Sequence, residues 1–129
     1  MEKRKFSKGE LICQEGTPGL TMYIILSGKV RIYKMMNIEK IELAILGSRD
    51  FCGEMSLLLE ETRTASMEAI IDTEVLILNR ESLLKKIQQD PAFALHMIRT
   101  MAARMMTADE IIPQIEGEKK SLEIMYGTK

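Results

Sequence analysis

The spacing of hydrophobic and polar positions changes near residue 79. Before it, short apolar runs alternate with turn-forming residues, and the runs lie at 11–13, 23–26, 30–33, 43–46, 67–71 and 75–78. The segments between them include GTPG at 16–19, Ser27-Gly28, residues 47–49 and Asp72-Thr73, and we expect Ser27-Gly28 and Asp72-Thr73 to be tight hairpin turns. Many short strands at close spacing predict an all-β barrel or jelly roll.

After residue 79 the pattern is helical. Leu83, Leu84 and Ile87 predict a short helix, and Asp90-Pro91 supplies an N-cap and a proline at the first position of a second helix. An apolar stripe at helical period then runs along this second helix, formed by Ala94, Met97, Ile98, Met101, Ala102, Met105 and Ala108. Pro113 is expected to end or kink it. The fold class is therefore mainly β with C-terminal helices.

Length and composition predict one globular domain over 1–129, with a β-barrel at about 6–79, helices at about 80–112 and a polar tail at 113–129. Hydrophobic residues make up 46% and charged residues 29% of the sequence. A net charge of −1 provides no basic surplus for nucleic acid. No apolar run is long enough for a membrane span, and the N-terminal MEKRKFSKGE lacks the apolar core of a signal peptide. Cys13 and Cys52 have no metal or disulfide-framework spacing, so we expect a cytoplasmic protein.

The stretch 50–69, DFCGEMSLLLEETRTASMEA, contains the residues for an anion site. Gly53 permits a sharp turn, and residues 54–59 are long enough for one or two helical turns whose first amides lack internal acceptors. Arg63 can offer a planar fork of donors to the same phosphate. Glu54 only accepts hydrogen bonds, and a ribose hydroxyl is a suitable donor. An anion and a hydroxyl in a small space point to a cyclic nucleotide.

This stretch resembles the phosphate-binding cassette of the cyclic nucleotide-binding domain family, whose signature is roughly F-G-E-(hydrophobic)-(small)-L-L, a loop, then R-(A/S/T)-A. The positions that match are Gly53, Glu54, Leu57, Leu58, Arg63, Thr64 and Ala65. Upstream, the family pattern is matched at Phe6, Gly9, Glu10, Glu15, Gly16, Gly19, Met22, Tyr23, Ser27, Gly28, Val30 and Tyr33. Cys52 and Ser56 depart from it, and both are small. The resemblance implies a β-roll with a short phosphate-cassette helix.

The same resemblance implies roles for individual residues. Glu54 would bind the ribose 2′-hydroxyl, Arg63 the cyclic phosphate, and the amides of Gly53, Ser56 and Ala65 would add donors. Met55 and Thr64 complete the expected ligand-binding set, and Thr64 permits cGMP without excluding cAMP, which is the favoured ligand. The helix after residue 90 would close as a lid, with Met105, Thr107 and Asp109 as candidates to cap the base. It would also pair two chains as a homodimer and pass the signal to an effector protein.

Three alternatives to a nucleotide sensor are an enzyme, a transcription regulator and a module that binds no ligand. A metal-dependent cupin enzyme needs several histidine and carboxylate ligands, whereas this chain has one histidine, His96, and offers no nucleophile–base set. We therefore expect no catalysis, no metal and no cofactor other than the regulatory nucleotide. A transcription regulator of the catabolite activator type carries a helix-turn-helix domain, for which the residues after Pro113 are too few. A ligand-silent interaction or dimerisation module with the same fold is the remaining alternative.

Overall fold

The structure is a computed structural model that describes the backbone of residues 1–111 and the side chains of residues 1–106. It divides the described chain into two compact units, Met1–Lys85 and the part that begins at Lys86. Each unit is described by itself. Of the predicted features, the end of the long helix at Pro113, the polar tail, and the side chains of Thr107, Ala108 and Asp109 lie outside the described residues.

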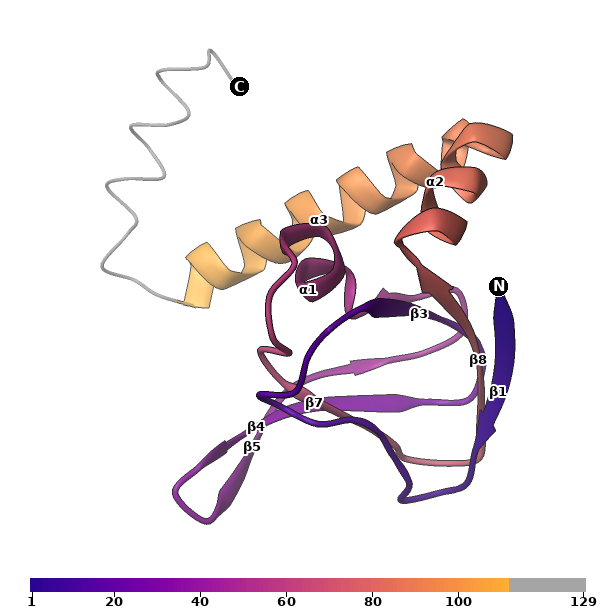
Figure 1. Ribbon diagram of the computed structural model, residues 1–129. Coiled ribbons are helices and arrows are strands. Elements are labelled where there is room, and N and C mark those ends of the chain that lie inside the picture. Colours follow the sequence, from indigo (N-terminus) through magenta and orange to yellow (C-terminus); the bar gives the residue numbers. More distant parts are fainter. Residues whose placement is uncertain (112–129) are drawn as a thin grey trace. The chain divides into compact units, whose positions relative to one another are not determined.

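The first unit is built from two four-stranded antiparallel sheets (Figure 1). One sheet has the strand order β1-β8-β3-β6, with the bounds Glu2–Phe6, Thr73–Asn79, Thr21–Ser27 and Phe51–Cys52. The other has the order β2-β7-β4-β5, with the bounds Leu11–Cys13, Ser66–Ala69, Val30–Met36 and Glu39–Leu46. The predicted mainly β fold with C-terminal helices is confirmed.

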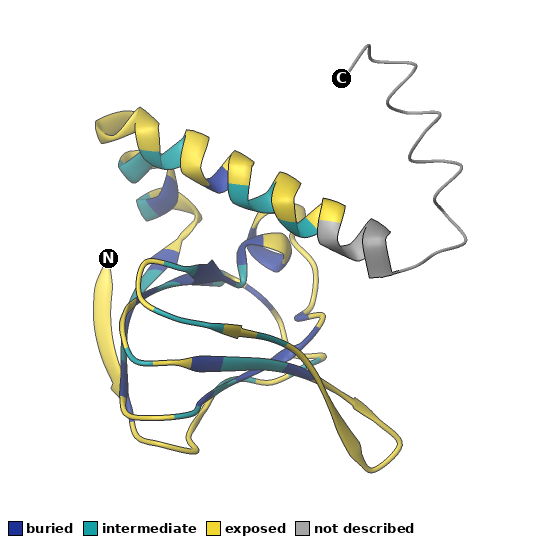
Figure 2. Ribbon diagram, turned by 180° about the vertical axis from the view of Figure 1, so that it is seen from behind, coloured by how far each residue is buried: buried dark blue, intermediate teal, exposed yellow. Residues whose placement is uncertain are grey.

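The core lies between the two sheets, and alternating residues from each sheet fill it. Figure 2 shows buried segments in the strands. Tyr23 and Ile25 of β3, two positions apart, contribute from one sheet, and Met67 and Ala69 of β7 contribute from the other. The cluster is completed by Phe6, Val30, Cys52 and Val75. Because β3 turns its odd-numbered residues inward, Thr21 lies on the same face as Tyr23, at the end of the strand.

The prediction that Ser27-Gly28 and Asp72-Thr73 form hairpin turns is wrong. Ser27-Gly28 leads from β3 to β4, and residues 70–72 lead from β7 to β8, but in both cases the two strands belong to different sheets. Short turns of this kind are corners of a sandwich, and a local turn signal does not distinguish a corner from a hairpin. A real hairpin joins β4 to β5 through Asn37-Ile38, with Asn37 in the left-handed region at φ 60°. Its tip projects from the first unit (Figure 1).

Three helices follow the sequence signals closely. Helix α1 spans Glu54–Leu59, which are the predicted bounds of the cassette helix. Helix α2, Arg80–Gln89, begins after Asn79, whose side chain accepts from the Ser82 amide at 2.9 Å while the Ser82 hydroxyl accepts from the Asn79 amide at 2.8 Å. This reciprocal pair is a capping box and explains where the helix starts. Helix α3 begins at the predicted Pro91 and is described as far as Ile111.

The apolar stripe of α3 is not uniformly buried. Met97 is buried, whereas Ile98 and Met105 are exposed, and so are their neighbours Leu95 and Met106. His96, off the stripe, is exposed as expected. Within the described residues, none of the helices combines the length and the apolar character that a membrane span requires.

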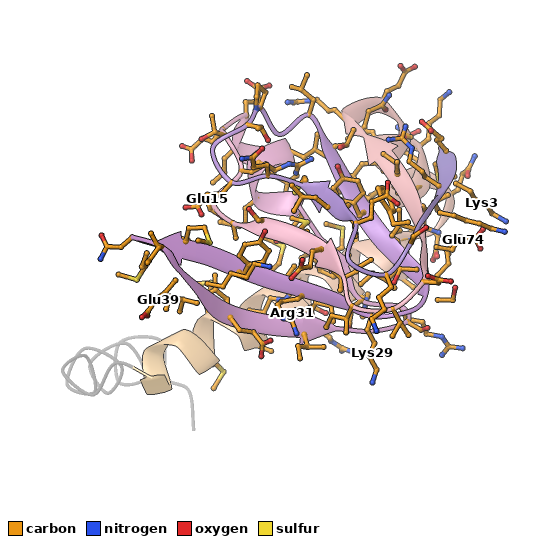
Figure 3. All side chains as sticks on the ribbon, turned by 90° about the horizontal axis from the view of Figure 1, so that it is seen from below. Lys3, Glu15, Lys29, Arg31, Glu39 and Glu74 are labelled. Carbon is orange, nitrogen blue, oxygen red and sulfur yellow. The ribbon has the colours of Figure 1, made fainter. Side chains whose placement is uncertain are left out.

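A charged cluster lies across the second sheet. Glu68 of β7 accepts from Arg31 Nη1 at 3.0 Å and from Lys40 Nζ at 3.1 Å, and Arg31 also binds Glu42 at 2.8 Å. Figure 3 shows Arg31 on this sheet. Burial opposes ionisation of Glu68, but the two cations outweigh it and hold the pKa of Glu68 below its usual value. Cross-strand ion pairs of this kind stabilise the pairing of β7, β4 and β5.

We expect Glu68→Gln to lower the free energy of unfolding at neutral pH and to flatten its acid dependence. Since the folded pKa of Glu68 is lowered, its contribution is fully present above the pKa of glutamate in the unfolded chain and is lost as pH falls through the folded pKa. Urea unfolding of both proteins across the acid range measures this. Glu42→Gln, which removes a more exposed carboxylate with one partner, is the control and should have the smaller effect. Parallel pH curves for wild type and Glu68→Gln would contradict the assignment.

Candidate functional site

Gly53 joins β6 to α1 in a conformation that only glycine adopts at low cost. Its φ is 84°, in the left-handed region, and it is the N-cap of α1. A Cβ at this position would lie 2.8 Å from Arg63 Nη1 and 3.2 Å from the Thr21 carbonyl oxygen. Gly53 is therefore required both for the turn and for the close approach of Arg63.

Helix α1 has one buried side and one exposed side. Glu54 and Ser56 are buried, at 5% and 4% exposure, together with Leu57. Met55, Leu58 and Leu59 are exposed. Glu54 stands in the first turn, where a carboxylate is favoured by the helix dipole. Met55, included in the predicted ligand-binding set, thus offers its backbone rather than a buried side chain.

The main chain of Arg63 is held by the loop between β2 and β3. The Arg63 amide donates to the Thr17 carbonyl at 2.8 Å, and the Arg63 carbonyl accepts from the Gly16 amide at 2.9 Å. Pro18 and Thr62, the neighbouring residues, form an isolated antiparallel β-bridge. Gly19, buried in the same loop, packs so closely on Ser56 that a Cβ would overlap its side chain. The sequence predicts that Gly16 and Gly19 are turn residues, and in the structure they also position Arg63.

The side chain of Arg63 is buried at 4% exposure and surrounded by neutral oxygens. Nη1 donates to Ser56 Oγ at 2.7 Å and to the Gly53 carbonyl at 3.2 Å. Nη2 donates to Thr21 Oγ1 at 3.0 Å and to the Tyr23 hydroxyl at 3.4 Å. The guanidinium carbon also lies 5.3 Å from the centre of the Tyr23 ring. Within the described part of the chain, Nε is buried and has no hydrogen-bond partner.

Thr21 and Tyr23 are the site residues that the sequence reasoning missed. They come from β3, forty or more positions before Arg63, and the cassette motif contains neither. A signal was present in their spacing, since residues two apart on a strand share one face and both carry hydroxyls. In the sequence, Tyr23 matches the upstream part of the family pattern, most of which concerns the fold and not the ligand.

The remaining predicted residues divide by exposure. Ala65 is buried and Thr64 is exposed. Met105, a candidate cap, is exposed on α3. Cys52 is buried in the core, while Cys13 is half-buried. Burial raises the pKa of the Cys13 thiol, and the Arg63 charge and a hydrogen bond from the Met67 backbone oppose that rise. The thiol is therefore close enough to Arg63 to sense its charge.

The chemistry of this arrangement is that of an anion site. Among the residues that the structure describes, the buried Nε–H of Arg63 has no acceptor, and an anionic oxygen is the acceptor that would satisfy it best. Thr64, which is exposed, follows Arg63 in sequence, and the first amides of α1 follow Gly53, whose carbonyl accepts from Arg63 Nη1. In residues 1–111, no group of three or more histidine, cysteine, aspartate or glutamate side chains is placed to hold a metal ion.

A two-sheet β-sandwich with a short helix, C-terminal helices and a buried arginine after that helix defines a class of ligand-binding domain. The sequence profile of the cyclic nucleotide-binding domain matches residues 3–90. The chain belongs to the cyclic nucleotide-binding domain family.

Named relatives agree with this placement. The cyclic AMP receptor protein of Thermus thermophilus is 34% identical over 126 residues, which are 97% of this chain and 58% of the relative. The crystal structure of the Thermus thermophilus catabolite activator protein superposes with a TM-score of 0.79 at 36% identity, covering 88% of this chain and 54% of that one. The chain thus spans little more than half the length of these relatives.

A third relative has been solved with two nucleotides. The cAMP-bound form of the EAL enzyme Bd1971 matches with a TM-score of 0.64 at 28% identity, over 98% of this chain and 34% of that one. Its cGMP-bound form matches with a TM-score of 0.63 at 30% identity, over 81% and 28%. The fold of this chain is therefore similar to that of domains in proteins solved with either nucleotide.

We expect Gly53→Ala to destabilise the protein more than Gly9→Ala. Both glycines have nearly the same φ, 84° and 85°, so both substitutions carry the left-handed strain of about 1–2 kcal/mol. A Cβ at Gly9 meets nothing within 4 Å, whereas one at Gly53 meets Arg63 and the Thr21 carbonyl. This crowding should cost about 1–3 kcal/mol more. Urea unfolding of the two variants measures the difference, and equal losses would show that Arg63 is not tightly packed on Gly53.

Proposed function

We propose that this chain binds a cyclic nucleotide through the β6–α1 turn, helix α1 and the segment around Arg63, and that it acts as a sensor rather than an enzyme. The observation that carries the proposal is the buried Arg63 guanidinium, whose Nε–H has no hydrogen-bond partner among the described residues. Family membership supports the choice of ligand. The proposed contacts are made by Gly53, Glu54, Met55, Ser56, Arg63, Thr64 and Ala65.

The charges of Arg63 and Glu54 decide which part of the nucleotide each would bind. Arg63 is a cation and pairs with the cyclic phosphate, assisted by the backbone amides of Gly53, Ser56 and Ala65. Glu54 is a hydrogen-bond acceptor and takes the ribose 2′-hydroxyl. The burial of Glu54 supports this role, because a ligand hydroxyl beside a shielded carboxylate forms a strong, charge-assisted hydrogen bond.

The preferred nucleotide is cAMP, with cGMP as the other candidate. Support comes from the named activity of the Thermus thermophilus cyclic AMP receptor protein, which matches nearly the whole chain. The exposed Thr64 hydroxyl is available to a guanine 2-amino group, so it permits cGMP as well. Met105, Thr107 and Asp109 remain the proposed cap of the base.

The signal would pass through α3. A ligand shifts a conformational equilibrium only through contacts that differ between the two states, and a helix that caps the base provides such contacts. The exposed apolar residues Leu95, Ile98, Met105 and Met106 support pairing of two chains through this helix in the cytoplasm, with an effector protein downstream.

We expect Arg63→Ala to weaken cyclic nucleotide binding by about 10- to 150-fold, because a hydrogen bond to a charged group contributes about 1.5–3 kcal/mol. Arg63→Lys should rescue only part of this loss, since lysine lacks the planar fork. Isothermal titration with cAMP and cGMP side by side measures both effects, and cAMP should bind wild type more tightly.

The control for Arg63 is Arg80→Ala, which removes an exposed arginine paired with Glu60 and should leave affinity unchanged. Circular dichroism must show that each variant is folded. Equal affinity of wild type and a folded Arg63→Ala would refute the phosphate assignment. No binding of either nucleotide by wild type would favour the ligand-silent module.

For Glu54, we expect wild type to bind 2′-deoxy-cAMP more weakly than cAMP by about 10-fold or more, as the lost bond is charge-assisted. Glu54→Gln keeps the size of the side chain, removes its charge and should narrow this discrimination. Competition titration of both ligands against both proteins provides the comparison. If wild type binds the two nucleotides equally, Glu54 does not read the ribose.

A further inference from the structure

The guanidinium of Arg63 is almost fully occupied by the protein itself. Arginine has five N–H donors. Its two terminal nitrogens carry four of them, and they face four acceptors, namely Ser56 Oγ, the Gly53 carbonyl, Thr21 Oγ1 and the Tyr23 hydroxyl. In the described chain only Nε–H is without an acceptor. A phosphate that binds arginine in the usual two-pronged manner takes two parallel N–H donors. One of the four protein acceptors must therefore give way.

The four contacts are not equally easy to exchange. The Gly53 carbonyl belongs to a turn whose backbone is fixed, and Ser56 Oγ makes the shortest contact, at 2.7 Å, while its own hydroxyl donates to that carbonyl at 3.1 Å. Thr21 Oγ1 lies at 3.0 Å. The Tyr23 hydroxyl makes the longest contact, at 3.4 Å, near the limit for a hydrogen bond.

Tyr23 also loses least when its contact is broken. Its hydroxyl lies 3.3 Å from Thr21 Oγ1, which donates to it, so it keeps a polar partner without Arg63. Its ring stays in the core beside the guanidinium, because it is buried among Phe6, Ile25 and Val75. The exchange therefore needs no movement of the strand.

We propose that Tyr23 is a positioning residue whose hydroxyl accepts from one Nη2–H of Arg63 in the free protein and is displaced by the phosphate of the ligand. Tyr23 therefore lowers the affinity for the nucleotide. Ser56 holds the guanidinium both in the free and in the bound protein. This rests on the proposed function, since it concerns the same arginine. Its effect is thermodynamic, because a contact present only in the free state must be lost before the ligand can bind.

The proposal predicts opposite effects for two hydroxyl deletions on one guanidinium. Tyr23→Phe removes an acceptor that only the free state uses and keeps the ring, so cAMP affinity should rise about 2- to 10-fold, the worth of one hydrogen bond. Ser56→Ala removes the shortest contact, leaves the guanidinium less ordered before binding, and should lower affinity about 2- to 10-fold. If the role of Tyr23 were purely structural, Tyr23→Phe would bind cAMP more weakly than wild type, or its affinity would change in the same direction as that of Ser56→Ala.

The control is Tyr33→Phe, which deletes the hydroxyl of another buried tyrosine, on β4 of the other sheet and beside Lys40. Its affinity for cAMP should match wild type. The chain has three tyrosines and no tryptophan, so tyrosine absorption reports on few groups. Binding of cAMP should change this absorption in wild type and Tyr33→Phe, and the change should vanish in Tyr23→Phe even though that variant binds more tightly.

The decisive measurement is isothermal titration of cAMP into wild type, Tyr23→Phe, Ser56→Ala and Tyr33→Phe, together with thermal unfolding of each free and saturated protein. Tyr23→Phe should destabilise the free protein and not the saturated one. The proposed displacement of Tyr23 is refuted if Tyr23→Phe binds cAMP no more tightly than wild type, or if Ser56→Ala binds it more tightly. Either result leaves the proposed function intact. If wild type binds neither cAMP nor cGMP, the proposed function and the exchange both fall.

Discussion

A buried arginine is the constraint on which the rest of this site depends. Removing a guanidinium from water is costly unless its donors are satisfied, and Arg63 is 96% buried, since its exposure is 4%. The fold meets this demand from three directions, with Ser56 and the Gly53 carbonyl from α1 and its cap, Thr21 and Tyr23 from β3, and the β2–β3 loop on the main chain. Several features that look unrelated in the sequence serve one side chain.

For the proposed binding of a phosphate, the consequence is that Arg63 is preorganised. An exposed arginine loses conformational entropy when it captures a phosphate, and that loss reduces affinity. Here the side chain and main chain of Arg63 are both held before any ligand arrives, so most of the ordering belongs to folding. Gly53 shows the cost of this arrangement, because the close approach of Nη1 leaves no room for a Cβ.

The sequence predicted the local parts of this molecule better than the long-range ones. The bounds of α1, the start of α3 at Pro91 and the proximity of Gly53 to Arg63 all depend on residues within a short stretch. The pairing of strands into sheets depends instead on residues that are far apart in the sequence. The turns at Ser27-Gly28 and Asp72-Thr73 carry hairpin signals, yet they connect strands of different sheets, because the partner of each strand is decided by burial across the sandwich. Thr21 and Tyr23 were missed for the same reason: β3 meets Arg63 only in the folded chain.

The acceptors around Arg63 share one chemical property. All four are neutral oxygens, three from hydroxyls and one from a carbonyl. A carboxylate in any of these places would satisfy the guanidinium more strongly, but it would also neutralise the charge that a phosphate needs and would resist displacement. Hydroxyls accept weakly enough to be exchanged and can rotate to a second partner, as the Thr21–Tyr23 contact shows. The four neutral oxygens thus stabilise a buried cation without neutralising its charge, which is what the proposed binding of an anionic ligand requires.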